Sequence, residues 1–326
     1  MKTNTIALVC TLLNEAESLQ PLLDSIDAQS HKPDEVVICD GGSTDGTLAT
    51  IRSWRQENQF PVKLMERAGA NIATGRNIAI SACQSSIICV TDGGCVLDKY
   101  WLENISRPLL DGAGGFGVVY GKTVAISHSI IGKQFSVFYE AKTRRHKTET
   151  ELSSRSVAFR KSVWEEVGGY PEWLKLAGED TYFFRLLAKV TKSMFAKDAF
   201  VYWHHGADSL FKIYKQQARN STASGELNSW PPLRYQVLFV LYTSIATGLV
   251  ASVRKHQMGV PALALLLAVT FRQAPSLFVI KNKSLLAFVC LPAIALARDM
   301  GMIGGYFNGQ RIRLKKGKSR ISRNVF

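Results

Sequence analysis

The stretch SSIICVTDGGCVLD, from Ser85 to Asp98, decides the fold of this 326-residue chain. Its β-forming run from Ile87 to Val90 predicts a short strand that is buried on both faces. Asp92 follows the run, and the Gly93-Gly94 pair ends the strand and lets a ligand approach the backbone closely. In open α/β sheets, ligands bind at the carboxyl ends of strands. Asp92 is therefore a candidate ligand-binding acid; the alternative is an aspartate that only begins a turn.

Earlier segments repeat this arrangement of a buried strand followed by a helix. We expect strands over residues 5–12, 35–39 and 62–66, and a first helix that is capped by Ser18. Together with the strand before Asp92, they make strand and helix alternate four times. This alternation predicts an α/β fold with a mixed, mostly parallel, Rossmann-like sheet and helices on both of its faces.

Polar residues follow three of the expected strands at the same edge of the sheet: Asn14-Glu15, Asp40 and Asp92. Asp40 opens the loop DGGSTDGT, in which ordinary turn hydrogen bonding is the alternative to ligand binding. Arg76 lies on the third expected helix, where a solvent-exposed position is the alternative. Because a turn has no need to place acids on neighbouring strand ends, the combination favours a shared binding site.

The chain has a net charge of +14, and this charge is concentrated in its C-terminal part. From Pro231 onward there are 14 basic residues and one acid, Asp299, so this part carries +13 and the first 230 residues carry +1. A nucleic-acid-binding domain is expected to have a basic face of its own. The distribution therefore argues against nucleic acid as a partner of the main domain.

The six cysteines show neither a CxxC pair nor the spacing of a zinc site. Three of them fall in strands that we expect to be buried. This usage is typical of thiols in a reducing compartment and not of a disulfide framework.

Five segments together resemble the successive motifs of family 2 glycosyltransferases, which are inverting enzymes with the GT-A fold. The segments are TLLNEAESL, VVICDGGSTDGT, GRNIAI, VTDGGCVLDKYWL and FRKSVWEEVGGYPEWLKLAGEDTYFFRL. The resemblance covers roughly Thr3 to Arg219, and the order and spacing of the segments make it specific. It implies the transfer of a sugar from a nucleotide-diphosphate donor, usually UDP-linked, with the assistance of a metal.

The resemblance also implies roles for residues at the sheet edge. Arg76 falls near the base of the donor. The base and ribose would be held by Thr11, Asn14, Glu15 and Asp40.

Farther along the chain, Gln216 and Arg219 match the Gln-X-X-Arg part of a motif found in processive members of the family. Arg219 would clamp the diphosphate of the donor. The tryptophan that usually follows is replaced by Asn220, which favours the addition of one sugar per encounter.

By the same resemblance, Asp92 is the first acid of an Asp-X-Asp metal motif, but Gly94 stands where the second acid is expected. Mg²⁺ or Mn²⁺ could still bind through Asp92 and phosphate oxygens of the donor, since magnesium sites use few protein ligands. His204 or His205, after the last expected core strand, is a further candidate ligand. Metal-independent catalysis is the alternative.

Glu179 and Asp180 begin an expected helix. At this position the helix dipole and the free N–H groups keep a carboxylate ionised. The resemblance implies that Asp180 is the base that takes the proton of the acceptor hydroxyl, and that Glu179 orients the acceptor. Without the resemblance, both residues could be ordinary first-turn acids of a helix.

The C-terminal part predicts membrane attachment by two spans and an interfacial segment. Residues 235–253 contain no formal charge and are long enough for one span. Residues 258–271 are a re-entrant or interfacial candidate, and residues 284–297 are a further apolar segment. The tail 311–323 holds seven basic residues and no acid, so the positive-inside rule places it in the cytoplasm. A buried helical hairpin in a soluble protein is the alternative.

We therefore expect a catalytic domain over residues 1–228, membrane-associated helices over 229–310 and a basic tail over 311–326. The expected protein is a glycosyltransferase at the cytoplasmic membrane, facing the cytoplasm, that uses a UDP-sugar and a lipid-linked or cell-envelope glycan acceptor. One alternative is a non-catalytic membrane scaffold with a degenerate sugar-nucleotide-binding domain, which Gly94 favours and Asp180 disfavours. Another is a sugar nucleotidyltransferase, which would need a Gly-rich basic phosphate loop where this chain has TLLNEAES.

Overall fold

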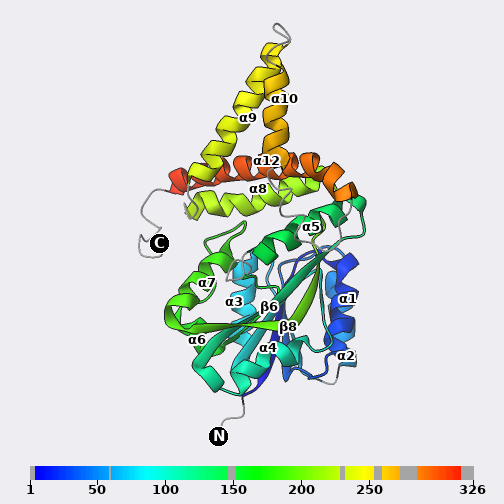
Figure 1. The fold of residues 1–326 in the computed structure, drawn as a ribbon. Helices are drawn as coiled ribbons and strands as arrows, with labels where there is room; N and C mark the ends of the chain where they lie inside the picture. The colour runs from blue at the N-terminus through cyan, green and yellow to red at the C-terminus, as the bar shows by residue number, and fades with distance from the viewer. Residues whose placement is uncertain are drawn as a thin grey trace. The chain divides into compact units, whose positions relative to one another are not determined.

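The structure contains two compact units, which are described separately (Figure 1). The computed structural model describes residues 4–58, 60–145, 152–227, 232–252, 259–271 and 285–316. The first unit consists of Met1–Ala125, Glu151–Lys175 and Glu179–His205, and the second consists of Ile126–Thr150, Leu176–Gly178 and Gly206–Phe326.

The first unit is built on a mixed sheet, whose eight strands in the described residues have the order β3-β2-β1-β4-β7-β6-β8-β5. The strands are β1 (Ile6–Leu12), β2 (Glu35–Asp40), β3 (Val62–Glu66), β4 (Ile87–Asp92), β5 (Cys95–Leu97), β6 (Phe116–Ile126), β7 (Val157–Arg160) and β8 (Lys192–His204). β1 pairs in parallel with β2 and β4, and β2 pairs in parallel with β3. β7 is antiparallel to both β4 and β6, and β5 is antiparallel to β8. The predicted α/β fold is confirmed.

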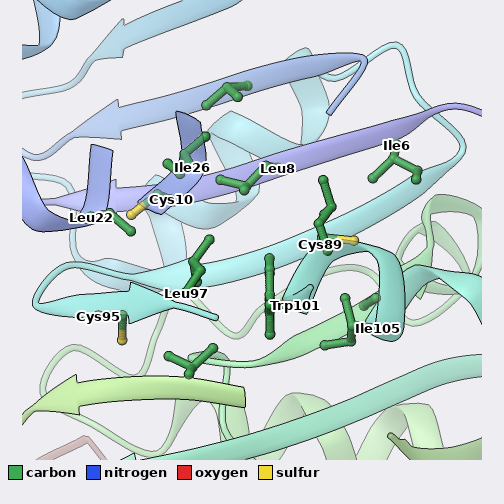
Figure 2. Packing of buried hydrophobic residues seen from close by; sticks show 14 of the residues in the cluster. Ile6, Leu8, Cys10, Leu22, Ile26, Cys89, Cys95, Leu97, Trp101 and Ile105 are labelled. Carbon is green, nitrogen blue, oxygen red and sulfur yellow. The ribbon is translucent and has the colours of Figure 1, made fainter. Parts of the chain in front are cut away.

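Two hydrophobic clusters fill the space between this sheet and its helices. Along β1, Leu8 and Cys10 belong to one cluster while Ala7 and Val9 belong to the other, as the two-residue period of a strand requires. Figure 2 shows part of the first cluster. The first cluster contains residues of the helices α1 (Ala16–Asp27), α2 (Thr47–Glu57) and α4 (Trp101–Leu110). The second cluster contains residues of α3 (Ile72–Ala82), α6 (Lys161–Glu166) and α7 (Glu179–Val190).

Strand register places the predicted polar residues on neighbouring strand ends. Thr11 of β1 lies opposite Asp92 of β4, and Leu12 of β1 lies opposite Asp40 of β2. The expected edge of the sheet therefore exists, and both acids are the last residues of their strands.

The start of α1 differs from the prediction. The helix begins at Ala16, with Glu15 and not Ser18 at the capping position. The Ala16 N–H donates to Asp45 Oδ2 over 3.1 Å, and the Glu15 N–H donates to Thr47 Oγ1 over 2.9 Å. Side chains about 30 residues farther along the chain thus accept the free N–H groups at the start of the helix. The local sequence around the helix start does not reveal these partners.

All six cysteines are free thiols, and five of them are buried. Cys89 of β4 and Cys10 of β1 are fully buried among apolar side chains (Figure 2).

The second unit is helical in its described residues. Its helices are α5 (Ile130–Arg145), α8 (Leu210–Leu227), α9 (Pro232–Ser252), α10 (Gly259–Phe271) and α12 (Leu285–Lys316). Among the described residues, one helical stretch is long and apolar enough to cross a membrane, Tyr235–Ser252 in α9. The apolar stretch in α10, Gly259–Val269, is shorter. α12 continues without a break from the third predicted apolar segment to the beginning of the predicted basic tail, whose residues 317–326 lie outside the described part.

α8 and α12 are packed with their backbones in close contact. Gly301, Gly305 and Gly309 lie four residues apart and therefore share one face of α12. A Cβ atom at these glycines would lie 2.4, 2.1 and 2.0 Å, respectively, from the carbonyl oxygens of Tyr214, Ala218 and Thr222 of α8. Side chains larger than hydrogen therefore do not fit on this face, as in the small-residue interfaces of membrane helices.

We predict that Gly305→Ala destabilises the second unit by about 1–3 kcal/mol, because the added methyl group forces the two helices apart. Thermal unfolding of the purified chain in detergent measures this change. Gly304→Ala is the matched control, since its Cβ would make an ordinary contact at 3.6 Å with the Tyr214 hydroxyl. Alanine there is expected to be neutral or slightly stabilising through its higher helix propensity. Equal effects of the two substitutions would contradict the close-packed interface.

Candidate active site

A buried arginine joins two acids from distant parts of the first unit. Arg76 of α3 is 1% exposed. Its Nη2 donates to Asp92 Oδ1 over 2.5 Å, and its Nη1 donates to Glu179 Oε1 over 2.8 Å. Burial acts to lower the pKa of Arg76, but the charges of Asp92 and Glu179 outweigh burial and raise it. Arg76 thus remains charged and fixes the end of β4 to the start of α7.

The ring of Tyr170 completes the surroundings of this arginine. The centre of the ring lies 5.2 Å from the Arg76 Cζ atom, and the ring stacks on Phe183 with a centroid separation of 3.9 Å. The Tyr170 hydroxyl lies 3.0 Å from Ser154 Oγ. Arg76 was predicted near the donor base, but the structure places its guanidinium inside this cluster.

Asp180 follows Glu179 directly at the start of α7. Burial, followed by the negative charge of Glu179, raises the pKa of Asp180 to about 6, while the charges of Arg76 and Arg155 act in the opposite direction. At neutral pH the carboxylate is therefore mostly ionised, yet it accepts a proton more readily than an ordinary aspartate. A pKa near the working pH is what a general base requires.

Asp40 organises the loop that follows β2. The carboxylate is fully buried. Its Oδ1 accepts the N–H groups of Gly42 and Ser43, each over 2.8 Å, and its Oδ2 accepts the Ser43 hydroxyl over 2.6 Å. The turn hydrogen bonding considered as an alternative is thus present, and the contact of Asp40 with a ribose stays a prediction.

Asn14 ties the loop after β1 to the loop after β2. Its Oδ1 accepts the N–H of Thr44 over 2.9 Å, and its own N–H donates to Ser43 Oγ over 2.8 Å. Its backbone is left-handed, with a φ angle of 55°, which asparagine tolerates better than most residues. The two predicted donor-binding loops therefore form one surface.

Glu15 and Thr11 both adjoin the end of β4. A Cβ atom at Gly93 would lie 2.8 Å from Glu15 Cδ, so the Glu15 side chain rests on this glycine. Burial raises the pKa of Glu15, and the nearby charge of Asp92 contributes. Thr11 lies opposite Asp92 in the sheet, and its buried Oγ1 has no hydrogen-bond partner among the described residues.

His204 lies next to Gly94, the residue that departs from the metal motif. Its N–H donates to the carbonyl oxygen of Gly94 over 2.9 Å, so the end of β8 is held beside the turn that follows Asp92. Neighbouring His205 is buried.

The described residues contain no group of three or more His, Cys, Asp or Glu side chains that could hold a metal ion. One oxygen of Asp92 is already bonded to Arg76. The residues present therefore do not form a metal site of their own. A metal that arrives with the donor, and takes most of its ligands from phosphate and water, requires only a single oxygen from Asp92.

Asn77, the neighbour of Arg76 on α3, fixes the segment before α7. Its Nδ2 donates to the carbonyl oxygen of Tyr170 and to Glu172 Oε1, each over 2.9 Å, and its Oδ1 accepts the Tyr170 N–H over 2.9 Å. A cavity of about 390 Å³ opens beside this segment and is lined by Asn77, residues 167–173, Tyr182 and Leu186. Its lining includes neither Asp92 nor Asp180.

Gln216 and Arg219 belong to α8 in the second unit. Arg219 is exposed, and its Nε donates to the carbonyl oxygen of Leu176 over 2.9 Å. The role of these two residues in holding the diphosphate stays a prediction.

Sequence reasoning missed Arg155 and Tyr170. The Arg155 guanidinium lies over the ring of Trp203, with its Cζ atom 3.6 Å from the ring centre. Arg155 directly precedes the buried run of β7. Because β7 is antiparallel to β4, the start of β7 lies at the edge of the sheet that carries Asp92, and this position was the signal available for Arg155. For Tyr170, the signal was an aromatic residue directly after Gly168-Gly169.

One solved structure of similar shape supports the GT-A fold. A mannosyltransferase from Pyrobaculum calidifontis, solved with GDP-Man and Mn²⁺, aligns with a TM-score of 0.53 and 18% identity, covering 98% of this chain and 89% of that chain. TarS residues 1–349 from S. aureus align with a TM-score of 0.48 and 16% identity, covering 97% of this chain and 93% of that chain. At such identity, the first of these likenesses establishes the fold alone.

A cholesterol galactosyltransferase from Borreliella burgdorferi is 21% identical over 136 residues. The match covers 42% of this chain, and it spans only about a third of the length of that relative (34%).

The sequence model of glycosyl transferase family 2 matches residues 8–168. This range contains the strands β1 to β4, with Asp40 and Asp92 at their ends, and the helix that carries Arg76. The family motifs that the sequence resembles thus lie at one edge of a GT-A sheet, and residues 8–168 of this chain form a glycosyl transferase family 2 domain.

Proposed function

We propose that this chain is an inverting glycosyltransferase that moves a sugar from a nucleoside-diphosphate donor to the hydroxyl group of a glycan or lipid-linked acceptor. The observation that carries this proposal is the Arg76 cluster. It joins Asp92, at the edge where open α/β sheets bind ligands, to Glu179, whose neighbour Asp180 has a raised pKa. This contact supports the proposal that a donor-binding acid and a general base work within one cluster of the first unit.

In the proposed reaction, Asp180 takes the proton of the acceptor hydroxyl as its oxygen attacks the anomeric carbon. A new carbon–oxygen bond forms on one face of the sugar while the bond to the diphosphate breaks on the other. The bonding electron pair leaves with the diphosphate oxygen, and the configuration at the anomeric carbon is inverted. The proton ends on Asp180 and passes to solvent.

For the donor, we propose that the joined loops after β1 and β2 hold the nucleoside through Thr11, Asn14, Glu15 and Asp40. UDP is the first nucleotide to test, and GDP is the second because the structurally similar mannosyltransferase was solved with GDP-Man. A divalent metal that enters with the donor would be held by Asp92, with His204 as a further candidate ligand, and would neutralise phosphate charge. Glu179 has one oxygen engaged by Arg76, so its role in orienting the acceptor would fall to the other oxygen.

For the location, we propose attachment to the cytoplasmic membrane through the second unit, with the catalytic unit in the cytoplasm. The apolar stretch Tyr235–Ser252 in α9 supports this, as does the basic end of α12. Near the start of α8, exposed Phe211 and Tyr214 lie beside Lys215, whose Nζ is 4.4 Å from the centre of the Phe211 ring. Aromatic and basic side chains of this kind are typical of membrane–water interfaces. A lipid-linked acceptor would then be met at the same surface.

A non-catalytic scaffold is the second candidate, because Gly94 occupies the place of a metal-binding acid. Against it stands the ordered arrangement of Arg76 and two acids around Asp180, which a scaffold does not need.

The proposal is tested by thermal unfolding of the purified chain with UDP-sugars and GDP-sugars, with and without Mn²⁺, and by measuring hydrolysis or transfer of any sugar nucleotide that binds. A ligand present at 100 times its Kd stabilises the folded state by about 2.7 kcal/mol, which is a clear rise in Tm. ATP is the control nucleotide. If no sugar nucleotide raises Tm above the ATP control or is turned over, the glycosyltransferase proposal is wrong. If one binds without turnover, the scaffold is favoured.

A further inference from the structure

We propose that α12 lies flat on the membrane surface, with an exposed apolar stripe in the lipid and its basic end bound to anionic phospholipid headgroups. The proposal rests on the membrane attachment proposed above. It adds the orientation of this helix and the class of lipid that it binds.

A stripe of exposed apolar side chains runs along α12. Its large members are separated by 3, 7, 11 and 7 residues, which are close to whole helical turns and keep them on one face. They are Leu286, Val289, Leu296, Phe307 and Leu314, of which Leu314 is the most exposed at 75%. A continuous apolar surface of this kind marks an interaction site.

The apolar helices α9 and α10 pack on the middle of the same face. Met300 and Ile303 of α12 pack in one cluster with residues of both helices: Leu238, Tyr242, Ile245 and Val269. The rings of Phe239 in α9 and Phe307 in α12 also meet, with their centroids 5.3 Å apart. Only 22% of the apolar stretch of α9 is buried within the described residues, as expected of a helix surrounded by lipid. The stripe therefore faces the side on which α9 would enter the membrane.

The other face of α12 packs on a polar helix. Gly301, Gly305 and Gly309, which bring α12 against α8, lie about 160° around the helix from the stripe. On α8, the charged side chains of Lys212, Lys215 and Arg219 are exposed. Hydrocarbon does not solvate charge, so α8 belongs in water or among headgroups, and α12 cannot cross the bilayer while it is packed on α8. A position along the interface suits both faces of α12.

The last turns of α12 add positive charge beside the stripe. Arg311 lies one turn after Phe307, Lys315 lies one turn after Arg311, and both are exposed. Neither is paired with an acid among the described residues, whereas the neighbouring Lys316 donates to Glu226 over 2.6 Å. Basic side chains next to exposed apolar groups match a surface that combines acyl chains with negative headgroups. The partner is therefore an anionic phospholipid.

The orientation is tested by spin labels on cysteines placed along and beside the stripe, in vesicles of phosphatidylcholine with phosphatidylglycerol. Cys290→Ser first removes the one cysteine that is not buried. Labels at Val289→Cys and Leu314→Cys should both lie about 5–10 Å below the headgroups, with more collisions with oxygen than with a nickel chelate. A label at Lys212→Cys on α8 should meet the chelate. A crossing helix would separate the two α12 labels in depth by about 38 Å, and this result would overturn the flat orientation.

The lipid is tested by adding phosphatidylglycerol or phosphatidylcholine to the purified chain in neutral detergent and measuring Tm. We expect half-saturation by phosphatidylglycerol at a mole fraction about 25-fold lower, because each of two basic side chains near an anionic surface contributes about fivefold. Arg311→Gln combined with Lys315→Gln should remove this preference and leave the response to phosphatidylcholine unchanged. Arg52→Gln combined with Arg55→Gln removes the same charge from exposed positions of α2, and both responses should stay within twofold of wild type.

Three results of this titration would overturn the lipid assignment. They are equal responses to the two lipids, an unchanged preference in the α12 double variant, and stabilisation by glycerol 1-phosphate as strong as that by phosphatidylglycerol, which would indicate a site for free phosphate. Sugar-nucleotide binding in the same samples is measured separately, so the glycosyltransferase proposal can stand while this one falls. If the chain stays soluble without detergent and does not associate with vesicles, the membrane attachment and this proposal fall together.

Discussion

Replacing Asp180 with asparagine is expected to lower kcat about 10³-fold while the fold stays intact. General-base catalysis contributes about 10²–10⁴-fold, and asparagine cannot take a proton from the acceptor hydroxyl. The substitution keeps the shape of the side chain and an oxygen that can accept the N–H of Thr181, which Asp180 Oδ1 now accepts over 2.7 Å. Sugar transfer or donor hydrolysis, measured at saturating donor, gives kcat.

The pH dependence of the wild-type reaction tests the same role. The pKa of Asp180 is raised to about 6 by burial and by Glu179. The base must be ionised to act, so kcat/KM should be constant above about pH 7 and fall about tenfold per pH unit below pH 6. The residual activity of Asp180→Asn should lack this fall.

Stability provides the control for this substitution. A carboxylate whose pKa is raised on folding binds more protons in the folded than in the unfolded state, so its contribution to stability decreases as pH rises from about 4 to 6. Removing the charge should therefore leave Tm at pH 7.5 unchanged or slightly higher. Glu17→Gln, at an exposed first-turn acid of α1, should affect neither kcat nor Tm. A loss of kcat in Asp180→Asn that accompanies a large drop in Tm would contradict the catalytic assignment.

Replacing Arg76 with methionine is expected to destabilise the first unit by about 3–5 kcal/mol, because one partner of a buried ion pair is removed and the other charges remain. Asp92 and Glu179 would both lose their cation, and Glu179 is only 6% exposed. For a unit of this size, the loss corresponds to a fall in Tm of roughly 6–20 °C. Donor turnover should be lost as well, because the end of β4 and the start of α7 would no longer be held together.

A second substitution distinguishes unpaired charge from lost packing. Arg76→Met combined with Glu179→Gln should recover part of the lost stability, since one of the two unpaired carboxylates is neutralised. Arg52→Met breaks an exposed pair with Glu66 and should cost less than about 1 kcal/mol. If Arg76→Met is no more harmful than Arg52→Met, the buried cluster does not hold the site together.

The sequence by itself determined the first four strands and the edge at which their polar residues meet. Buried runs such as 87–90 mark strands because apolar residues on both faces must be covered by helices. The beginning of α7 at Glu179 could likewise be predicted, since acids at a helix start followed by a periodic apolar face form a local signal. The long contact between the parallel helices α8 and α12 could not be predicted. Its glycines allow another helix to approach closely, but they do not specify which helix does so.

Only the tertiary structure decided how the charges pair. Arg76 and Glu179 are 103 residues apart in the chain, and nothing local to Arg76 distinguishes a buried cation from an exposed one. The same holds for the capping of α1 by Asp45 and for the stacking of Arg155 on Trp203. Hydrophobic periodicity records which face of an element is covered, and this can be read along the chain. The partner of a buried charge depends on strand register and on the packing of helices from remote segments, and these exist only once the chain has folded.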